Sequence, residues 1–66
     1  MKLLVNGQEE SVESSMTVQA FLVNRGQDPK AVAVAVNEEF IPRTRFDQTL
    51  LQHGDSLEVV APMQGG

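Results

Sequence analysis

The chain has 66 residues, and its nine acidic side chains outnumber the five basic ones to give a net charge of −4. A chain of this length forms one small domain whose core leaves little stability for a strained catalytic pocket, which favours a partner or substrate of enzymes over an enzyme. The acidic balance opposes nucleic-acid binding, and the sequence shows neither a bilayer-spanning apolar run nor a leader peptide, so we expect a cytoplasmic protein with no nucleic-acid or membrane partner.

The start of the chain has the pattern of a β-hairpin. Residues 2–5 form a short apolar run that ends at Asn6-Gly7, the strongest short-range signal for a tight turn between two strands. Residues 9–13 are then expected to return as the second strand, with an exposed acidic outer side.

A helix is predicted next. Thr17, or alternatively Ser15, can cap the first free backbone N–H groups with its hydroxyl. Apolar residues at positions i, i+3 and i+4, beginning at Val18, form one stripe on a helix of about nine residues. Gly26 can end this helix in a left-handed conformation.

Three further strands follow. Residues 31–36 alternate Ala and Val, which predicts a strand with the valines on one face and a shallow alanine surface on the other. Phe40-Ile41 predicts a brief strand that Pro42 ends. Residues 43–51 are expected to be irregular or to contain a short helical turn, with Phe46 and either Leu50 or Leu51 tucked inward, and residues 57–61 form the last strand.

This order of elements predicts the fold class. Strand, strand, helix, strand, short strand and strand fit one twisted sheet with the helix packed on one face. We therefore predict an α+β fold of the β-grasp (ubiquitin-like) type over residues 1–61, with a mixed sheet of about four or five strands.

Residues 62–66 are a separate feature. Pro62-Met63-Gln64 leads from the last strand to Gly65-Gly66. Glycine lacks Cβ, so we predict a flexible tail that can thread a narrow channel and present the Gly66 carboxylate to an enzyme. A carboxylate is a poor electrophile, so acyl chemistry there requires prior activation, for which adenylation by ATP is the standard route. An idle terminus is the alternative.

No other segment predicts an active site. His53, Asp55 and Ser56 are neighbours in one turn, whereas a nucleophilic triad needs side chains that converge from separate elements. The chain has one histidine and no cysteine, which argues against a transition-metal site and excludes a side-chain persulfide.

Two apolar residues are candidates for partner contact. Phe40 follows two glutamates and precedes a proline, so it fits either the core or an exposed recognition patch beside the alanine-faced strand. Met63 lies beyond the last strand, where its flexible side chain suits an adaptable contact. Pro62 would stiffen the exit of the tail.

Three segments carry a family resemblance: VNEEFIPR at 36–43, GDSLEVV at 54–60 and PMQGG at 62–66. Together they resemble the ThiS family, the ubiquitin-like sulfur carriers of thiamine biosynthesis. The pattern Val-Asn-x-x-Phe-Ile-Pro-Arg with a closing Gly-Gly is fairly specific, whereas Gly-Asp before the last strand is shared by many β-grasp proteins. The resemblance covers essentially the whole chain.

The resemblance implies a carrier rather than an enzyme. An E1-like adenylyltransferase would use ATP and Mg²⁺ to adenylate Gly66, and a persulfide sulfur supplied through a cysteine desulfurase would displace AMP to give a C-terminal thiocarboxylate. Thiazole synthase would then take this sulfur into the thiazole ring. Gly65 would let the tail enter both active sites, Pro62, Met63 and Gln64 would line the same channels, and this chain would bind no cofactor or metal itself.

Three alternatives remain open. The small subunit of molybdopterin synthase uses the same thiocarboxylate, although the Pro42-Arg43 context with Met63-Gln64 favours thiamine. A ubiquitin-like binding module with an idle tail belongs to a different class of function, and conjugation to target lysines is a further possibility. Deleting Gly66 separates these classes, because only a binding module would survive it.

Overall fold

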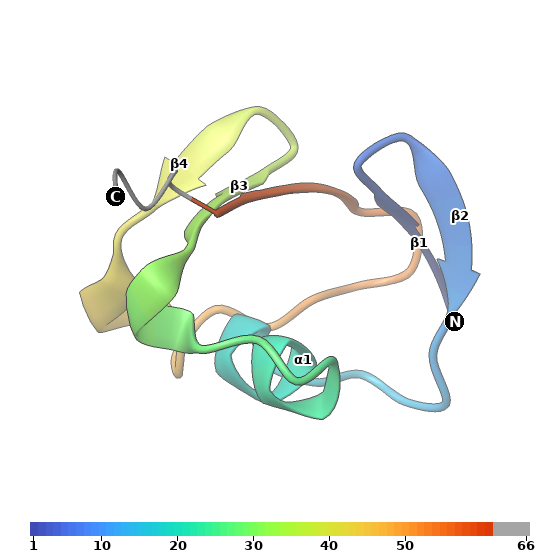
Figure 1. Ribbon diagram of the computed structural model, residues 1–66. Helices are drawn as coiled ribbons and strands as arrows, with labels where there is room; N and C mark the ends of the chain where they lie inside the picture. The colour runs from blue at the N-terminus through green and yellow to red at the C-terminus, as the bar shows by residue number, and fades with distance from the viewer. Residues whose placement is uncertain (62–66) are drawn as a thin grey trace.

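The structure is a computed structural model that describes residues 1–61. Five strands form one sheet in the order β2-β1-β5-β3-β4, and the helix α1 lies across one face of it (Figure 1). The last strand, β5, is central, because it pairs in parallel with β1 and antiparallel with β3. This is the mixed β-grasp sheet that the sequence predicts. The elements in chain order are β1 (Lys2–Val5), β2 (Gln8–Ser11), α1 (Val18–Asn24), the 3-10 helix η1 (Pro29–Ala31), β3 (Ala33–Val36), β4 (Glu39–Ile41), the 3-10 helix η2 (Arg43–Arg45) and β5 (Ser56–Val60).

Both hairpins turn on two residues with positive φ. Asn6 and Gly7 have φ of 51° and 83°, the left-handed geometry that matches the twist of the flanking strands. Asn37 and Glu38 connect β3 and β4 with φ of 52° and 68°. The second strand therefore starts at Gln8 rather than at residue 9, because a two-residue turn places Gln8 directly opposite Val5.

Helix α1 has the two ends that the sequence indicates. The Oγ1 atom of Thr17 accepts a hydrogen bond from the backbone N–H of Ala20 at 3.1 Å, so Thr17 is the N-cap. At the other end Gly26 has a φ of 77°, and its N–H donates to the carbonyl of Val23 at 3.0 Å. The helix spans seven residues, fewer than expected, because Arg25 is already its C-cap.

The third strand starts later than predicted. Asp28 accepts a hydrogen bond from the backbone N–H of Lys30 at 3.0 Å and caps η1, so the chain is still turning at Ala31. From Ala33 the alternation holds: Val34 is buried, and the two alanines of the strand lie on the opposite face. The predicted valine and alanine faces are thus confirmed, and only the start of the strand was wrong.

The core fills the space between the sheet and α1. Phe46, the C-cap of η2, is buried, as predicted, and its carbonyl accepts a hydrogen bond from the backbone N–H of Gln19 in α1 at 3.0 Å. Of the two leucines that could turn inward, Leu51 is buried and Leu50 is 56% exposed. Within residues 1–61, the buried core consists of Leu3, Val5, Val18, Phe21, Leu22, Val34, Ile41, Phe46, Leu51, Leu57 and Val59.

Candidate functional site

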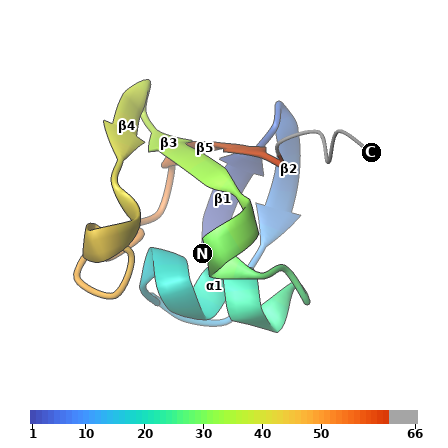
Figure 2. The ribbon, with the colours of Figure 1, turned by 60° about the vertical axis from the view of Figure 1, so that its left-hand side comes forward.

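The sheet face opposite α1 presents an apolar surface. Figure 2 shows α1 on one side of the sheet and, within residues 1–61, no other helix on the far side. Strand alternation places on this far side the residues between the buried ones. We call them the open-face patch: Leu4, Ala33, Ala35, Phe40 and Val60.

Register joins most of these residues into one surface. Ala35 lies directly opposite Phe40 across β3 and β4. On its other side Ala35 lies opposite Glu58, and Ala33 lies opposite Val60. Because alanine is small, the rings and methyl groups around it stay accessible to a partner. Two charged residues border this surface, because Glu58 lies opposite Ala35 and Glu9 lies opposite Leu4.

Phe40 belongs to this surface and not to the core. Its exposed fraction is 66%, the largest among the exposed large apolar residues of the described chain. Large apolar side chains that stay in water as a contiguous patch mark interaction sites. The structure thus settles which of the two environments Phe40 has, and its contact with a partner remains a prediction.

The predicted tail residues Pro62, Met63, Gln64, Gly65 and Gly66 lie outside the described residues. The structure does show where the chain approaches them. β5 ends at Val60, which lies opposite Ala33 at the start of β3. The chain therefore leaves the sheet beside the open-face patch.

The strand that leads to the tail is held by side chains as well as by neighbouring strands. β1 ends before it reaches Val59, and there the side chain of Asn6 supplies the hydrogen bonds that a neighbouring strand would make. Its Nδ2 donates to the carbonyl of Val59 at 3.2 Å, and its Oδ1 accepts from the N–H of Val59 at 2.9 Å. These two bonds fix the end of β5 where the backbone ladder to β1 has ended.

A second asparagine fixes the beginning of β5. The Oδ1 of Asn37 accepts a hydrogen bond from the N–H of Ser56 at 3.0 Å, and its Nδ2 donates to Asp55 Oδ1 at 3.1 Å. The sequence showed Asn6 and Asn37 only as turn residues. Both are the first residue of a hairpin turn, which is the one feature of the sequence that marks them. The strand that they bind, β5, is remote in sequence, so the sequence does not reveal these hydrogen bonds.

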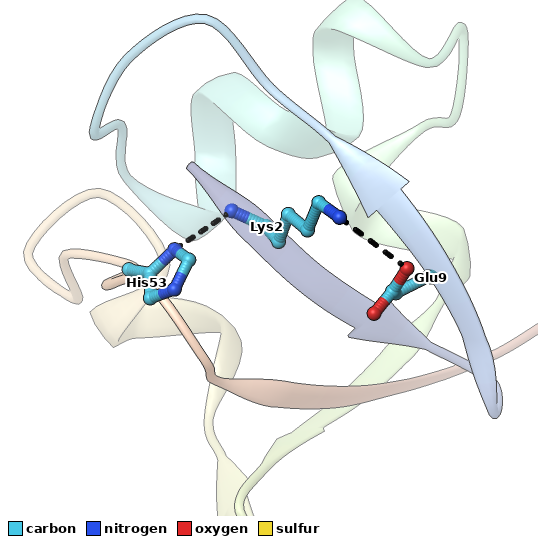
Figure 3. A network of polar contacts seen from close by, with 3 residues as sticks. All are labelled: Lys2, Glu9 and His53. Carbon is cyan, nitrogen blue, oxygen red and sulfur yellow. Dashed lines mark hydrogen bonds and ion pairs between the residues drawn. The ribbon is translucent and has the colours of Figure 1, made fainter.

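The turn that holds the only histidine has a structural role. His53 Nδ1 accepts a hydrogen bond from the backbone N–H of Lys2 at 3.0 Å, and Lys2 Nζ pairs with Glu9 at 3.7 Å (Figure 3). Asp55 Oδ2 accepts the N–H of Gln52 at 2.8 Å, the local turn bond expected of an aspartate. Both groups are thus engaged in closing the turn against β1.

Two further properties concern residues 1–61 alone. In this part of the chain no three acidic or histidine side chains gather closely enough to hold a metal ion. Over the same residues, no helix has the length and apolar character needed to cross a membrane.

Comparisons with known proteins cover the entire chain. The model of the ThiS family matches residues 2–66. A thiazole synthase from Paramagnetospirillum magneticum is 44% identical over all 66 residues, and the chain spans 20% of the length of that relative. The sulfur carrier protein ThiS from Thermus thermophilus is 39% identical over 62 residues, which are 94% of this chain and 95% of that one. The crystal structure of a thiamine biosynthesis protein (ThiS) from Geobacter metallireducens has a TM-score of 0.87 at 33% identity, with all of both chains covered.

Proposed function

The chain belongs to the ThiS family, and we propose that it is the sulfur carrier of thiamine biosynthesis, with Gly66 as its working residue. The observation that carries this proposal is the extent of the family match, which includes residues 62–66 with their diglycine. The described domain supports it by presenting an apolar face beside the strand that leads to the tail.

The chemistry proposed for Gly66 follows from the properties of a carboxylate. It is ionised at neutral pH and does not react with nucleophiles. An E1-like adenylyltransferase removes this barrier when the carboxylate attacks the α-phosphorus of ATP, with Mg²⁺ bound by that enzyme, and pyrophosphate leaves. A persulfide then attacks the acyl carbon and AMP leaves, which gives an acyl disulfide. A thiol cleaves that disulfide, becomes oxidised to a disulfide itself, and releases the thiocarboxylate.

This route explains how a chain without cysteine can carry sulfur. The sulfur is bound to the backbone carbonyl of the last residue, so no side-chain nucleophile is needed. Sulfur reaches the acyl adenylate as the persulfide of a cysteine desulfurase or of a protein that it loads. In this proposal the chain is a co-substrate and binds no cofactor.

The domain contributes recognition and placement. Phe40 and its neighbours in the open-face patch dock the adenylating enzyme, because that surface is apolar, exposed and beside the exit of the tail. The two hydrogen bonds from Asn6 to Val59 hold the end of β5 still, so that a docked domain delivers its tail from a fixed point. The channel that leads to the partner's active site then holds the tail residues Pro62, Met63, Gln64 and Gly65.

Thiazole synthase is the proposed acceptor of the sulfur. Two proteins named thiazole synthase each contain a stretch similar to the whole of this chain, which occupies 20% of their length. A carrier-like stretch in the same polypeptide as a synthase indicates that the two act together. This favours the thiamine pathway over molybdopterin synthase.

The test is sulfur delivery in a reconstituted system. The full chain and a chain lacking Gly66 are each incubated with the adenylating enzyme, ATP with Mg²⁺, and a desulfurase with cysteine. Each mixture also contains either thiazole synthase or the large subunit of molybdopterin synthase, together with the organic substrates of that synthase. We expect thiazole formation only with the full chain and thiazole synthase. Thiazole formation by the shortened chain would refute the role of Gly66, and product in the molybdopterin reaction alone would assign the other pathway.

A further inference from the structure

A groove opens next to the open-face patch, between the start of β3 and η2. Its volume is about 230 Å³. Apolar atoms form its floor, because Phe46 and Ile41 of the core lie beneath it. The residues that matter for its recognition properties are Lys30, Val32, Ala33, Phe40 and Arg43.

The charge of this groove differs from that of the whole chain. Among residues 1–61, Lys30 and Arg43 are the only charged residues in its lining, although the chain carries a net charge of −4. Within residues 1–61, ion pairs engage Lys2 and Arg25, and neither groove cation takes part in one. Asp28 is near in sequence, but its carboxylate accepts the backbone N–H of Lys30.

The groove also lies where a partner of the tail must come. It shares Phe40 and Ala33 with the open-face patch. Ala33 lies opposite Val60, the last residue of β5. An enzyme that takes Gly66 into its active site therefore approaches the end of the sheet that contains the groove.

We propose that the groove is a docking site for an acidic segment of the adenylating enzyme. An apolar side chain of that segment packs against Phe40 and Val32, and carboxylates beside it pair with Lys30 and Arg43. Arginine binds a carboxylate through two parallel N–H groups, so Arg43 fixes orientation as well as adding attraction. The inference rests on the proposed function, from which it takes the identity of the partner.

The two groove cations lie on an otherwise acidic chain, and this arrangement lets the groove select the orientation in which a partner docks. An acidic body attracts a basic enzyme surface in any orientation, so it speeds encounter without selecting a pose. Two cations in a groove beside the tail accept only a pose that brings carboxylates to that end of the sheet. In the proposed function the adenylating enzyme acts on the free carrier before thiazole synthase does, so we assign the groove to the adenylating enzyme.

The test compares two double charge reversals that change the net charge equally. One is Lys30→Glu with Arg43→Glu. The matched control is Arg25→Glu with Arg45→Glu, two residues that line neither the groove nor the open-face patch. Pyrophosphate release by the adenylating enzyme is measured against carrier concentration at low and high salt, and thermal unfolding checks each fold. We expect the groove variant to raise KM about tenfold or more at low salt with kcat little changed, and the control to change KM by about twofold at most.

The outcomes separate this proposal from the proposed function. If the wild-type chain is adenylated and both reversals have the same KM, the groove proposal is wrong and the carrier function stands. If the wild-type chain is not adenylated, the carrier function fails. A KM increase for thiazole synthase alone also contradicts the proposal, because the groove would then serve the other enzyme. Should the glutamate variant unfold, Lys30→Gln with Arg43→Gln must show a smaller KM increase in the same direction.

Discussion

Replacing Phe40 by alanine separates the contribution of this residue to docking from its contribution to folding. The exposed fraction of Phe40 is 66%, so the free chain loses few contacts, and the free energy of unfolding is expected to change by about 0.5 kcal/mol or less. A phenylalanine side chain buries on the order of 200 Å², so about 130 Å² of this one remains for a partner to cover. At about 25 cal/mol per Å² that area corresponds to roughly 3 kcal/mol.

A partner that covers half or more of this area would lose about 1.5 to 3 kcal/mol of docking energy in Phe40→Ala. The expected increase in KM for the carrier is then about 10-fold to 100-fold. Pyrophosphate release by the adenylating enzyme measures KM, and denaturant unfolding measures stability. Val23→Ala is the matched control, because Val23 is 55% exposed but lies on α1, on the opposite side of the sheet. A normally folded Phe40→Ala chain with unchanged KM would refute docking through this patch.

Two stability predictions follow from other parts of the fold. Phe46→Ala removes a buried core ring and should lower the free energy of unfolding by about 3 to 5 kcal/mol. In a domain this small, circular dichroism should then show much of the chain unfolded at room temperature. A native spectrum with an unchanged thermal midpoint would mean that the core tolerates the cavity. Glu38→Gly replaces a side-chain residue at a φ of 68° and should raise the free energy of unfolding by about 0.5 to 1 kcal/mol in denaturant titration. A loss of stability in Glu38→Gly would show that the glutamate side chain contributes more than its backbone costs.

The features that the sequence predicted correctly depend mostly on interactions between residues close together in the chain. Thr17 and Gly26 marked the two ends of α1 because a hydroxyl and a residue without Cβ satisfy specific backbone needs there. The start of β3 was misplaced because alternation cannot tell a strand from the turn before it. Asp28 and Pro29 form a capped 3-10 turn, and that local preference prevailed over the strand pattern.

The site depended on contacts between remote segments. The brief strand β4 fits the sheet with either face inward, and the pairing of Phe40 with Ala35 decides that the ring is exposed. The bonds from Asn6 to Val59 join residues 53 positions apart, which no local pattern reveals. The groove arises because η1 and η2 place Lys30 and Arg43 around the same hollow.

The mass of the chain after incubation with ATP, the adenylating enzyme, and a desulfurase with cysteine shows directly whether Gly66 carries sulfur. The sulfur is then located by fragmentation. A carrier gains the mass difference of one oxygen replaced by sulfur, and the fragments place it at Gly66. An unchanged mass with enzymes that are active on another carrier, or sulfur located anywhere else in the chain, would show that Gly66 does not carry the sulfur.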